Sequence, residues 1–167
     1  AVETDCDYIL PNGLHSGSHV NLGRICQSER TLAPIVEAID EMLRGRNFDT
    51  LVSTSWALAT IARRLIWRRA DGQFRRIQHV TVEGYDPPYI LEAVPSGARA
   101  IVLVDVVVTG NQVARVTEEL KRQNAASVEV IAIVDAQFAG TRVAGTFEAL
   151  CRMAIGVEVA WKCLRCD

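Results

Sequence analysis

The hydrophobic positions of this chain follow two periodicities that alternate along its length. Between Thr31 and Arg44 they recur at helical spacing, which predicts an amphipathic helix that Gly45 ends. The same spacing predicts a second helix with Leu58 and Leu65 on its apolar face, and a third with Val113 and Leu120. Short apolar runs lie between and after these helices. They predict strands at residues 50–54, 79–82, 89–94, 100–108 and 128–134.

The N-terminal segment has a different pattern, which predicts a β-hairpin. A first strand ends at Pro11, and Asn12-Gly13 is a strong signal for a tight turn. Val20 and Leu22 alternate with polar residues on the return, so we expect a second strand that includes both.

Strands that alternate with helices predict an α/β fold, with a mainly parallel, twisted sheet flanked by helices on both faces. The run from residue 100 to 108 is interrupted only by Asp105, as expected of a central parallel strand covered on both sides. A length of 167 residues fits a single domain with a sizeable core.

Composition and charge exclude several classes of protein. The chain is 49% apolar and 23% charged, which is typical of a folded globular protein. A net charge of −2 gives no general attraction to nucleic acid or membrane, and we expect neither as a partner. No apolar run is long enough to span a membrane, and the acidic start Ala1–Asp5 does not resemble a signal peptide. Five cysteines within ordinary helix and strand patterns favour a reducing cytoplasm.

Ligands of parallel sheets bind beyond the carboxyl ends of the strands, which nominates residues 53–57, residues 105–113 and the loop after Val134. Asp105 lies near a strand end, where its carboxylate could accept hydrogen bonds from sugar hydroxyls. The turn 109–112 then leads into a helix, whose first N–H groups suit a phosphate. From the spacing alone, an ordinary strand-to-helix turn is equally compatible with this segment.

Residues 101–113 resemble the ribose-5-phosphate motif of type I phosphoribosyltransferases. That motif has two acids after a strand, two apolar residues, two threonines and a glycine; Asp105, Thr109 and Gly110 match it. Further segments resemble orotate phosphoribosyltransferases most, within that family. These are the hood segment 13–16, the strand and pyrophosphate loop 48–57, the strand 131–135 and the Cys-x-x-Cys ending at 163–166.

The resemblance implies that one domain spans residues 1–167. A hood of residues 1–28 and the C-terminal segment would cover a core of about residues 29–150. It also implies a Mg²⁺-dependent transfer of a phosphoribosyl group between phosphoribosyl pyrophosphate and a pyrimidine-like base, carried out by a homodimer.

The resemblance also assigns roles to residues. Asp105 would be the catalytic contact to the ribose. The sugar phosphate would lie on Asp105, Thr109, Gly110, Asn111, Gln112 and Val113. The pyrophosphate would lie on Ser53, Thr54, Ser55, Trp56 and Ala57, and the base on Ser18 and His19.

Several matched positions depart from the family pattern. Val104 replaces the first acid, Val108 the first threonine, and Gly84 a loop lysine; the chain's lysines, Lys121 and Lys162, lie elsewhere. Pro11 replaces a basic hood residue. These changes keep an alternative open: a catalytically impaired protein that binds a phosphorylated sugar or nucleotide as a sensor or partner. Base release by hydrolysis is a third possibility.

Cys163 and Cys166 have the spacing of half a zinc site. A complete site would need two more ligands, from Cys6, Cys26 or Cys151. Reduced thiols or a local disulfide compete with zinc. Cys151 itself fits the core side of a strand.

Overall fold

The structure is a computed structural model that describes residues 2–9, 14–68, 77–84, 88–137, 143, 145–154 and 156–159. For residues 2–7, 14 and 157–159 it describes the backbone alone.

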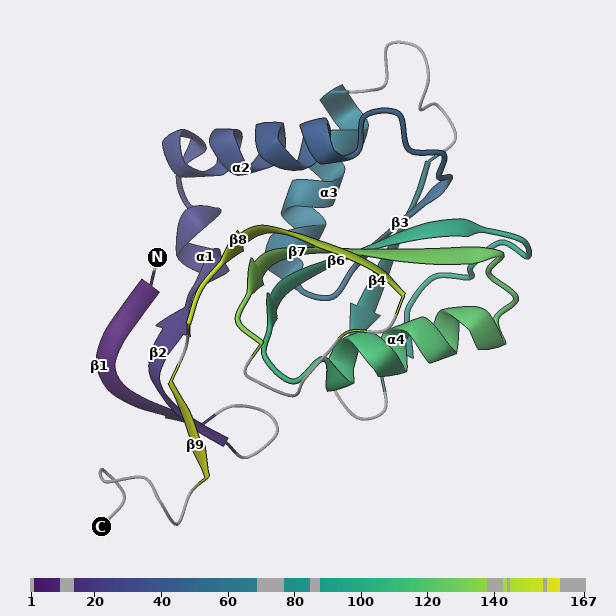
Figure 1. Ribbon diagram of the computed structural model, residues 1–167. Helices are drawn as coiled ribbons and strands as arrows, with labels where there is room; N and C mark the ends of the chain where they lie inside the picture. Colours follow the sequence, from purple (N-terminus) through teal and green to yellow (C-terminus); the bar gives the residue numbers. More distant parts are fainter. Residues whose placement is uncertain are drawn as a thin grey trace.

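A twisted sheet of six strands forms the centre of the molecule (Figure 1). Its strand order is β5-β4-β3-β6-β7-β8, and every neighbouring pair is parallel except β4 and β5. The prediction of a mainly parallel sheet is therefore confirmed. The strands are β3 (Thr50–Ser53), β4 (Gln78–Glu83), β5 (Tyr89–Ile90), β6 (Arg99–Val107), β7 (Ser127–Asp135) and β8 (Thr146–Arg152).

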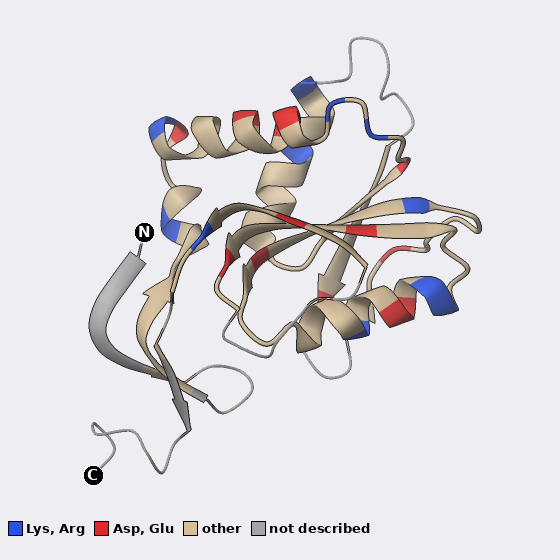
Figure 2. Cartoon of the chain, in the orientation of Figure 1, with Lys and Arg blue, Asp and Glu red and all other residues tan. Residues whose placement is uncertain are grey.

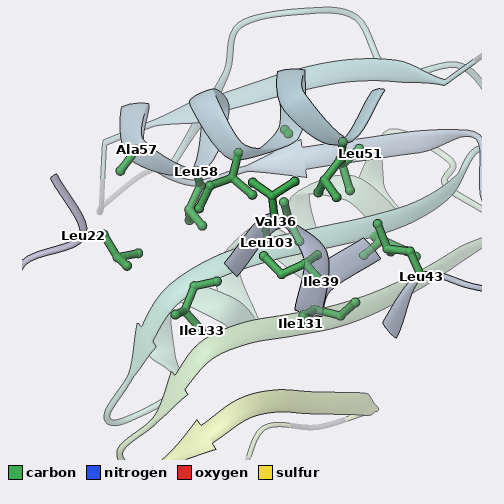
Figure 3. Packing of buried hydrophobic residues seen from close by; sticks show 14 of the residues in the cluster. Leu22, Val36, Ile39, Leu43, Leu51, Ala57, Leu58, Leu103, Ile131 and Ile133 are labelled. Carbon is green, nitrogen blue, oxygen red and sulfur yellow. The ribbon is translucent and has the colours of Figure 1, made fainter. Parts of the chain in front are cut away.

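Helices cover both faces of this sheet. Helices α2 (Glu29–Met42) and α3 (Trp56–Arg68) lie on one face, and α4 (Asn111–Arg122) lies on the other (Figure 1). The central strand β6 contributes Ile101 and Leu103 to the first apolar layer, and Val102 and Val104 to the second. Figure 3 shows Leu103 packed within the first layer. All four side chains are almost completely buried. Burial on both faces explains why this strand is an unbroken apolar run in the sequence.

A second, smaller sheet joins the two ends of the described chain. Strands β1 (Val2–Ile9) and β2 (Leu14–Val20) form the hairpin, and β9 (Val157–Val159) pairs antiparallel with β2. We call these three strands the hood sheet. It lies beyond the carboxyl ends of β6 and β7 (Figure 1).

The return strand of the hairpin is shorter than the sequence predicted. Leu22 is not a strand residue; it begins the short helix α1 (Leu22–Ile25) and is buried. The side chain of Asn21 causes the change, because its Oδ1 accepts a hydrogen bond from the N–H of Arg24 at 3.2 Å and caps the helix.

One other local prediction needs correction. The strand predicted over residues 89–94 is restricted to Tyr89–Ile90. Helical spacing lets Arg122 pair with either Glu118 or Glu119, and it pairs with Glu119 at 2.6 Å. Glu119 also accepts a hydrogen bond from Gln123 at 2.8 Å, so one carboxylate serves two donors at the end of α4. No helix within the described residues is long and apolar enough to cross a membrane.

Candidate functional site

The parallel registers bring the predicted turns to one edge of the sheet. Ser53, the last residue of β3, pairs with Leu103 of β6, and Val107 at the end of β6 pairs with Asp135 at the end of β7. The hydroxyl of Thr54 donates to the carbonyl oxygen of Leu103 at 3.1 Å, so a side chain ties the turn after β3 to the strand that carries Asp105. The turns after β3 and β6 are therefore neighbours.

The turn after β6 is open at the start of α4. Gly110 is the N-cap residue, with φ of 77° in the left-handed region, and no side chain caps the helix. The N–H of Asn111 makes a long contact of 3.4 Å with the hydroxyl oxygen of Thr109. The first turn of α4 itself has no acidic side chain (Figure 2). Uncapped N–H groups at a helix start favour a negatively charged ligand.

The predicted phosphate-binding residues differ in how they face this turn. Thr109, Gly110 and Gln112 are half-buried, and Asn111 is exposed. Val113 is only 3% exposed and packs in the core with Val116, so its side chain cannot touch a ligand. Its part in the predicted site is limited to the main chain.

Asp105 lies close to the end of β6 and is half-buried. Its carboxylate accepts hydrogen bonds from main-chain N–H groups, including that of Val106 at 2.9 Å. Burial raises the pKa of Asp105, and these hydrogen bonds together with the charge of His19 act in the opposite direction. Among the described residues no lysine or arginine forms an ion pair with it. The carboxylate is thus held in place by the backbone.

The turn after β3 begins at the completely buried Ser53 and ends at the buried Ala57. Ser55 caps α3, since its hydroxyl oxygen accepts from the N–H of Leu58 at 3.3 Å. Trp56 is 66% exposed, yet one edge of its ring rests against Gly23 of α1. The turn is therefore fixed to the helix that follows the hood strands.

The two predicted base-binding residues lie on β2 of the hood sheet. The ring of His19 stacks on that of Tyr8, with centroids 4.9 Å apart. The hood sheet that carries His19 lies beyond the carboxyl end of β6 (Figure 1), and the charge of His19 lowers the pKa of Asp105. Ser18 is engaged through its main chain, which exchanges hydrogen bonds of 2.8 and 3.2 Å with the hydroxyl of Ser16.

The third nominated place, the loop after Val134, begins with a carboxylate that already has partners. Asp135 accepts from the side-chain amide of Gln137 at 2.9 Å and from its N–H at 3.2 Å. Arg152 of β8 also pairs with it at 3.2 Å. These contacts connect the ends of β7 and β8, and Asp105 is the less engaged acid at this edge.

The cysteines do not form a metal cluster in the part of the chain that the structure describes. Cys163 and Cys166 lie outside the described residues. Cys26 donates to the carbonyl oxygen of Ala57 at 3.6 Å, and burial raises the pKa of its thiol. Cys151 is on β8 as expected, but it is exposed and does not belong to the core.

The described residues at this edge offer the carboxylate of Asp105 as a possible metal ligand, but not a complete metal site. No described group of three or more His, Cys, Asp or Glu side chains could hold a metal by itself. Mg²⁺ usually keeps several waters and binds one or two carboxylates together with substrate phosphates. Asp105 could supply one carboxylate beside the open turn at Gly110.

We compared this chain with known proteins. No protein-family model and no curated protein matches the sequence. Among solved structures, orotate phosphoribosyltransferase from Aeropyrum pernix superposes with a TM-score of 0.68 at 19% identity, over 92% of this chain and 88% of that one. Leishmania donovani UMP synthase gives a TM-score of 0.68 at 18% identity, over 91% of this chain and 33% of that longer protein. Adenine phosphoribosyltransferase from Thermoanaerobacter pseudethanolicus gives 0.67 at 14% identity, over 81% and 88%.

This chain has the type I phosphoribosyltransferase fold. Val104, which the resemblance aligns with the first acid of the phosphate motif, is 1% exposed and packs in the layer under α4. Val104 is therefore a core residue, and a carboxylate at this position would be buried among apolar side chains. Gly84, the residue at the expected lysine position, directly follows β4 and has φ of 77°.

His79 is a further residue of this edge, which hydrophobic periodicity places only within a strand. Its Nε2 lies 2.9 Å from the hydroxyl oxygen of Ser53. The signal was the strand order: once β3 and β4 are neighbours, His79 and Ser53 point to the same face of the sheet.

Proposed function

We propose that this protein is a phosphoribosyltransferase-like protein that transfers a phosphoribosyl group between phosphoribosyl pyrophosphate and a pyrimidine-like base. The observation that carries the proposal is the uncapped start of α4 at Gly110 beside the backbone-held carboxylate of Asp105. The free N–H groups at the start of α4 suit a phosphate, and the carboxylate of Asp105 suits sugar hydroxyls.

The chemistry would depend mainly on positioning and charge. The anomeric carbon of the sugar becomes positively charged as pyrophosphate leaves, and the attacking base nitrogen must be held on the opposite side. Asp105 would hold the ribose, the turn 109–112 would hold the 5′-phosphate, and main-chain groups of residues 53–57 would hold the leaving pyrophosphate. Mg²⁺ would neutralise part of the pyrophosphate charge when bound.

The hood supports a base site near His19. The imidazole of His19 is stacked on Tyr8 in the hood sheet, which lies beyond the carboxyl end of β6 (Figure 1), so the two rings would lie at the entrance to the ribose site. A stacked pair of flat rings can pack against a flat base. A pyrimidine-like base is the ligand that this arrangement and the likeness to orotate phosphoribosyltransferases support together.

An alternative function is nucleotide binding without turnover, as a sensor or partner protein. The buried Val104 favours it, because a second acid for the ribose cannot be supplied from that position. In this alternative the turn at Gly110 and Asp105 still bind a nucleoside monophosphate.

Ligand-induced thermal stabilisation separates the two functions. A ligand at about 100 times its dissociation constant adds about 2.7 kcal/mol to the free energy of unfolding. For the enzyme, phosphoribosyl pyrophosphate with Mg²⁺ stabilises the protein, and pyrophosphate is released when a pyrimidine base is added. For the sensor, a nucleoside monophosphate stabilises it and no base causes release. If neither ligand stabilises the protein, the proposal is wrong.

We also propose a homodimer, by analogy with the same fold. Light scattering on the purified protein tests this directly, because a monomer of 18.4 kDa and a dimer are well separated in mass.

A further inference from the structure

A buried hydrogen bond lies directly behind the turn after β3. Ser53 is completely buried at the end of β3, and its hydroxyl oxygen is 2.9 Å from Nε2 of His79 on β4. His79 is half-buried and shares a sheet face with Leu51 and Ser53, the face that α3 covers. Residues 54–57 follow Ser53 immediately, so this bond fixes the first residue of the turn.

Two charged side chains from other elements act on the pKa of His79, those of Glu92 and Arg63. Glu92, which follows β5, accepts a hydrogen bond from the N–H of Thr81 at 2.6 Å. Arg63 belongs to α3. Burial lowers the pKa of His79, Glu92 opposes that effect, and Arg63 adds to it. The imidazole is therefore mostly neutral at pH 7, with one ring nitrogen as donor and the other as acceptor.

The other two hydroxyl groups of the turn also face inward. That of Thr54 donates to Leu103 of β6, and that of Ser55 accepts from Leu58 of α3. Ser53, Thr54 and Ser55 are thus bound to three different elements, β4, β6 and α3. With its hydroxyls occupied in this way, the turn is left to contact an anion through its main chain.

From this arrangement we infer that His79 is a positioning residue. It acts through Ser53 to hold the main chain of residues 53–57 in the shape that receives the pyrophosphate group of the ligand. The inference rests on the proposed function, because it assigns the pyrophosphate to this turn. His79 does not itself touch the ligand.

The test compares two probes on the same set of variants. Inorganic pyrophosphate with Mg²⁺ reports on the turn after β3, and ribose 5-phosphate reports on the turn at Gly110. H79L removes the hydrogen bond, and H79Q keeps an amide that can reach Ser53. S53A removes the hydroxyl partner of the same hydrogen bond with little change in side-chain volume. The double variant H79L/S53A completes a double-mutant cycle.

We expect H79L and S53A each to weaken pyrophosphate binding about tenfold, with ribose 5-phosphate affinity changed less than about twofold. The double variant should lose no more than either single one, because both remove the same bond. H79Q should recover most of the pyrophosphate affinity. A purely structural histidine would reduce both affinities together and would not be rescued by glutamine.

Each other result decides the matter. If H79L and S53A bind pyrophosphate as the wild type does, His79 is not a positioning residue, while the proposed function stands. If the wild type binds ribose 5-phosphate but not pyrophosphate, the inference is wrong and the 5′-phosphate site remains. If it binds neither probe, the proposed function fails and this inference fails with it. If H79L does not fold, S53A and H79Q give the same comparison.

Discussion

The indole of Trp56 lies so close to Gly23 that there is no room for a side chain at that position. A Cβ built on Gly23 would be 2.8 Å from Cζ2 of the ring and 3.1 Å from Oδ1 of Asn21. Gly23 belongs to α1, directly after the hood strands, and Trp56 begins α3 after the candidate pyrophosphate turn. The hood side of the molecule and the turn are thus in direct contact.

This contact predicts that the effect of G23A depends on residue 56. In the wild type, G23A should lower the free energy of unfolding, because the indole or α1 must shift. With W56A already present, the same G23A change should cost less, since Asn21 Oδ1 at 3.1 Å is then the nearest of the atoms around the new methyl group. Urea unfolding of the four proteins measures both effects. Equal effects of G23A in the two backgrounds would show that the ring does not restrict this position.

The second prediction concerns Asp105 and stability. Because burial raises the pKa of this carboxyl, the folded protein holds its proton more tightly than the unfolded chain does. The stability contributed by Asp105 is complete below the ordinary aspartate pKa and is lost as the pH rises through the raised value. D105N cannot ionise, so it should be more stable than the wild type at pH 7, and this gain should shrink as the pH falls toward 4.

Urea unfolding of wild type and D105N across that pH range is the measurement. D105N should also bind ribose 5-phosphate roughly tenfold or more weakly, as expected when a charged hydrogen-bond acceptor is removed. E118Q, an exposed carboxylate on α4, is the control for loss of one charge. A D105N protein that is less stable at pH 7 would contradict the burial argument, and unchanged ribose 5-phosphate binding would exclude Asp105 from the site.

The third prediction uses two glycines with the same backbone conformation. Gly110 has φ of 77° and Gly97 has φ of 78°, but Gly97 precedes the amino end of β6, away from the candidate site. Alanine in this left-handed conformation costs roughly 1–2 kcal/mol. G110A and G97A should therefore lose similar stability, while only G110A should lose ribose 5-phosphate affinity. If both variants bind this ligand as the wild type does, the turn at Gly110 is not its phosphate site.

The fourth prediction concerns an ion-pair cluster on β7 and β8, nearer the amino ends of these strands than the candidate site is. Arg46 donates to Glu129 of β7 and Glu148 of β8, each at 2.6 Å, and to the carbonyl oxygen of Met42 at 2.6 Å. Its side chain is 17% exposed. R46A should lower the free energy of unfolding by about 1–3 kcal/mol, because charged partners are left in a partly buried place.

R44A is the matched control for R46A. Arg44 pairs with Glu41 at 2.7 Å, but both side chains are more than 60% exposed, at 71% and 64%. An exposed pair contributes between 0 and about 1 kcal/mol. Equal losses for R44A and R46A in urea unfolding would mean that the pairs to β7 and β8 do not stabilise the sheet.

Most of the central sheet could be predicted from periodicity, because its strands are buried on both faces and its helices are strongly amphipathic. The errors occur where one side chain overrides the periodic pattern. Leu22 fitted a strand by alternation, but the Asn21 cap begins a helix there. Arg122 could pair with either Glu118 or Glu119, and spacing alone cannot choose between them.

The candidate site was predicted only in part, for a related reason. Asp105 and Gly110 are recognisable because a buried acid and a glycine stand out against an apolar strand. The resemblance also assigns Val113 to the phosphate site, but its side chain packs inward and leaves only its main chain to take part. The pair of His79 and Ser53 joins residues 26 positions apart, so it becomes visible only when the order of β3 and β4 is known.

The central claim is that main-chain amides at the start of α4 bind a sugar phosphate beside Asp105. Titration of the ¹⁵N-labelled protein with ribose 5-phosphate, followed by amide NMR shifts, measures this directly. We expect the largest saturable shifts at Thr109, Gly110, Asn111 and Gln112, with a further change at Val106, whose N–H contacts the Asp105 carboxylate. Shifts that occur elsewhere, or no saturable shift at millimolar ligand, would contradict the claim.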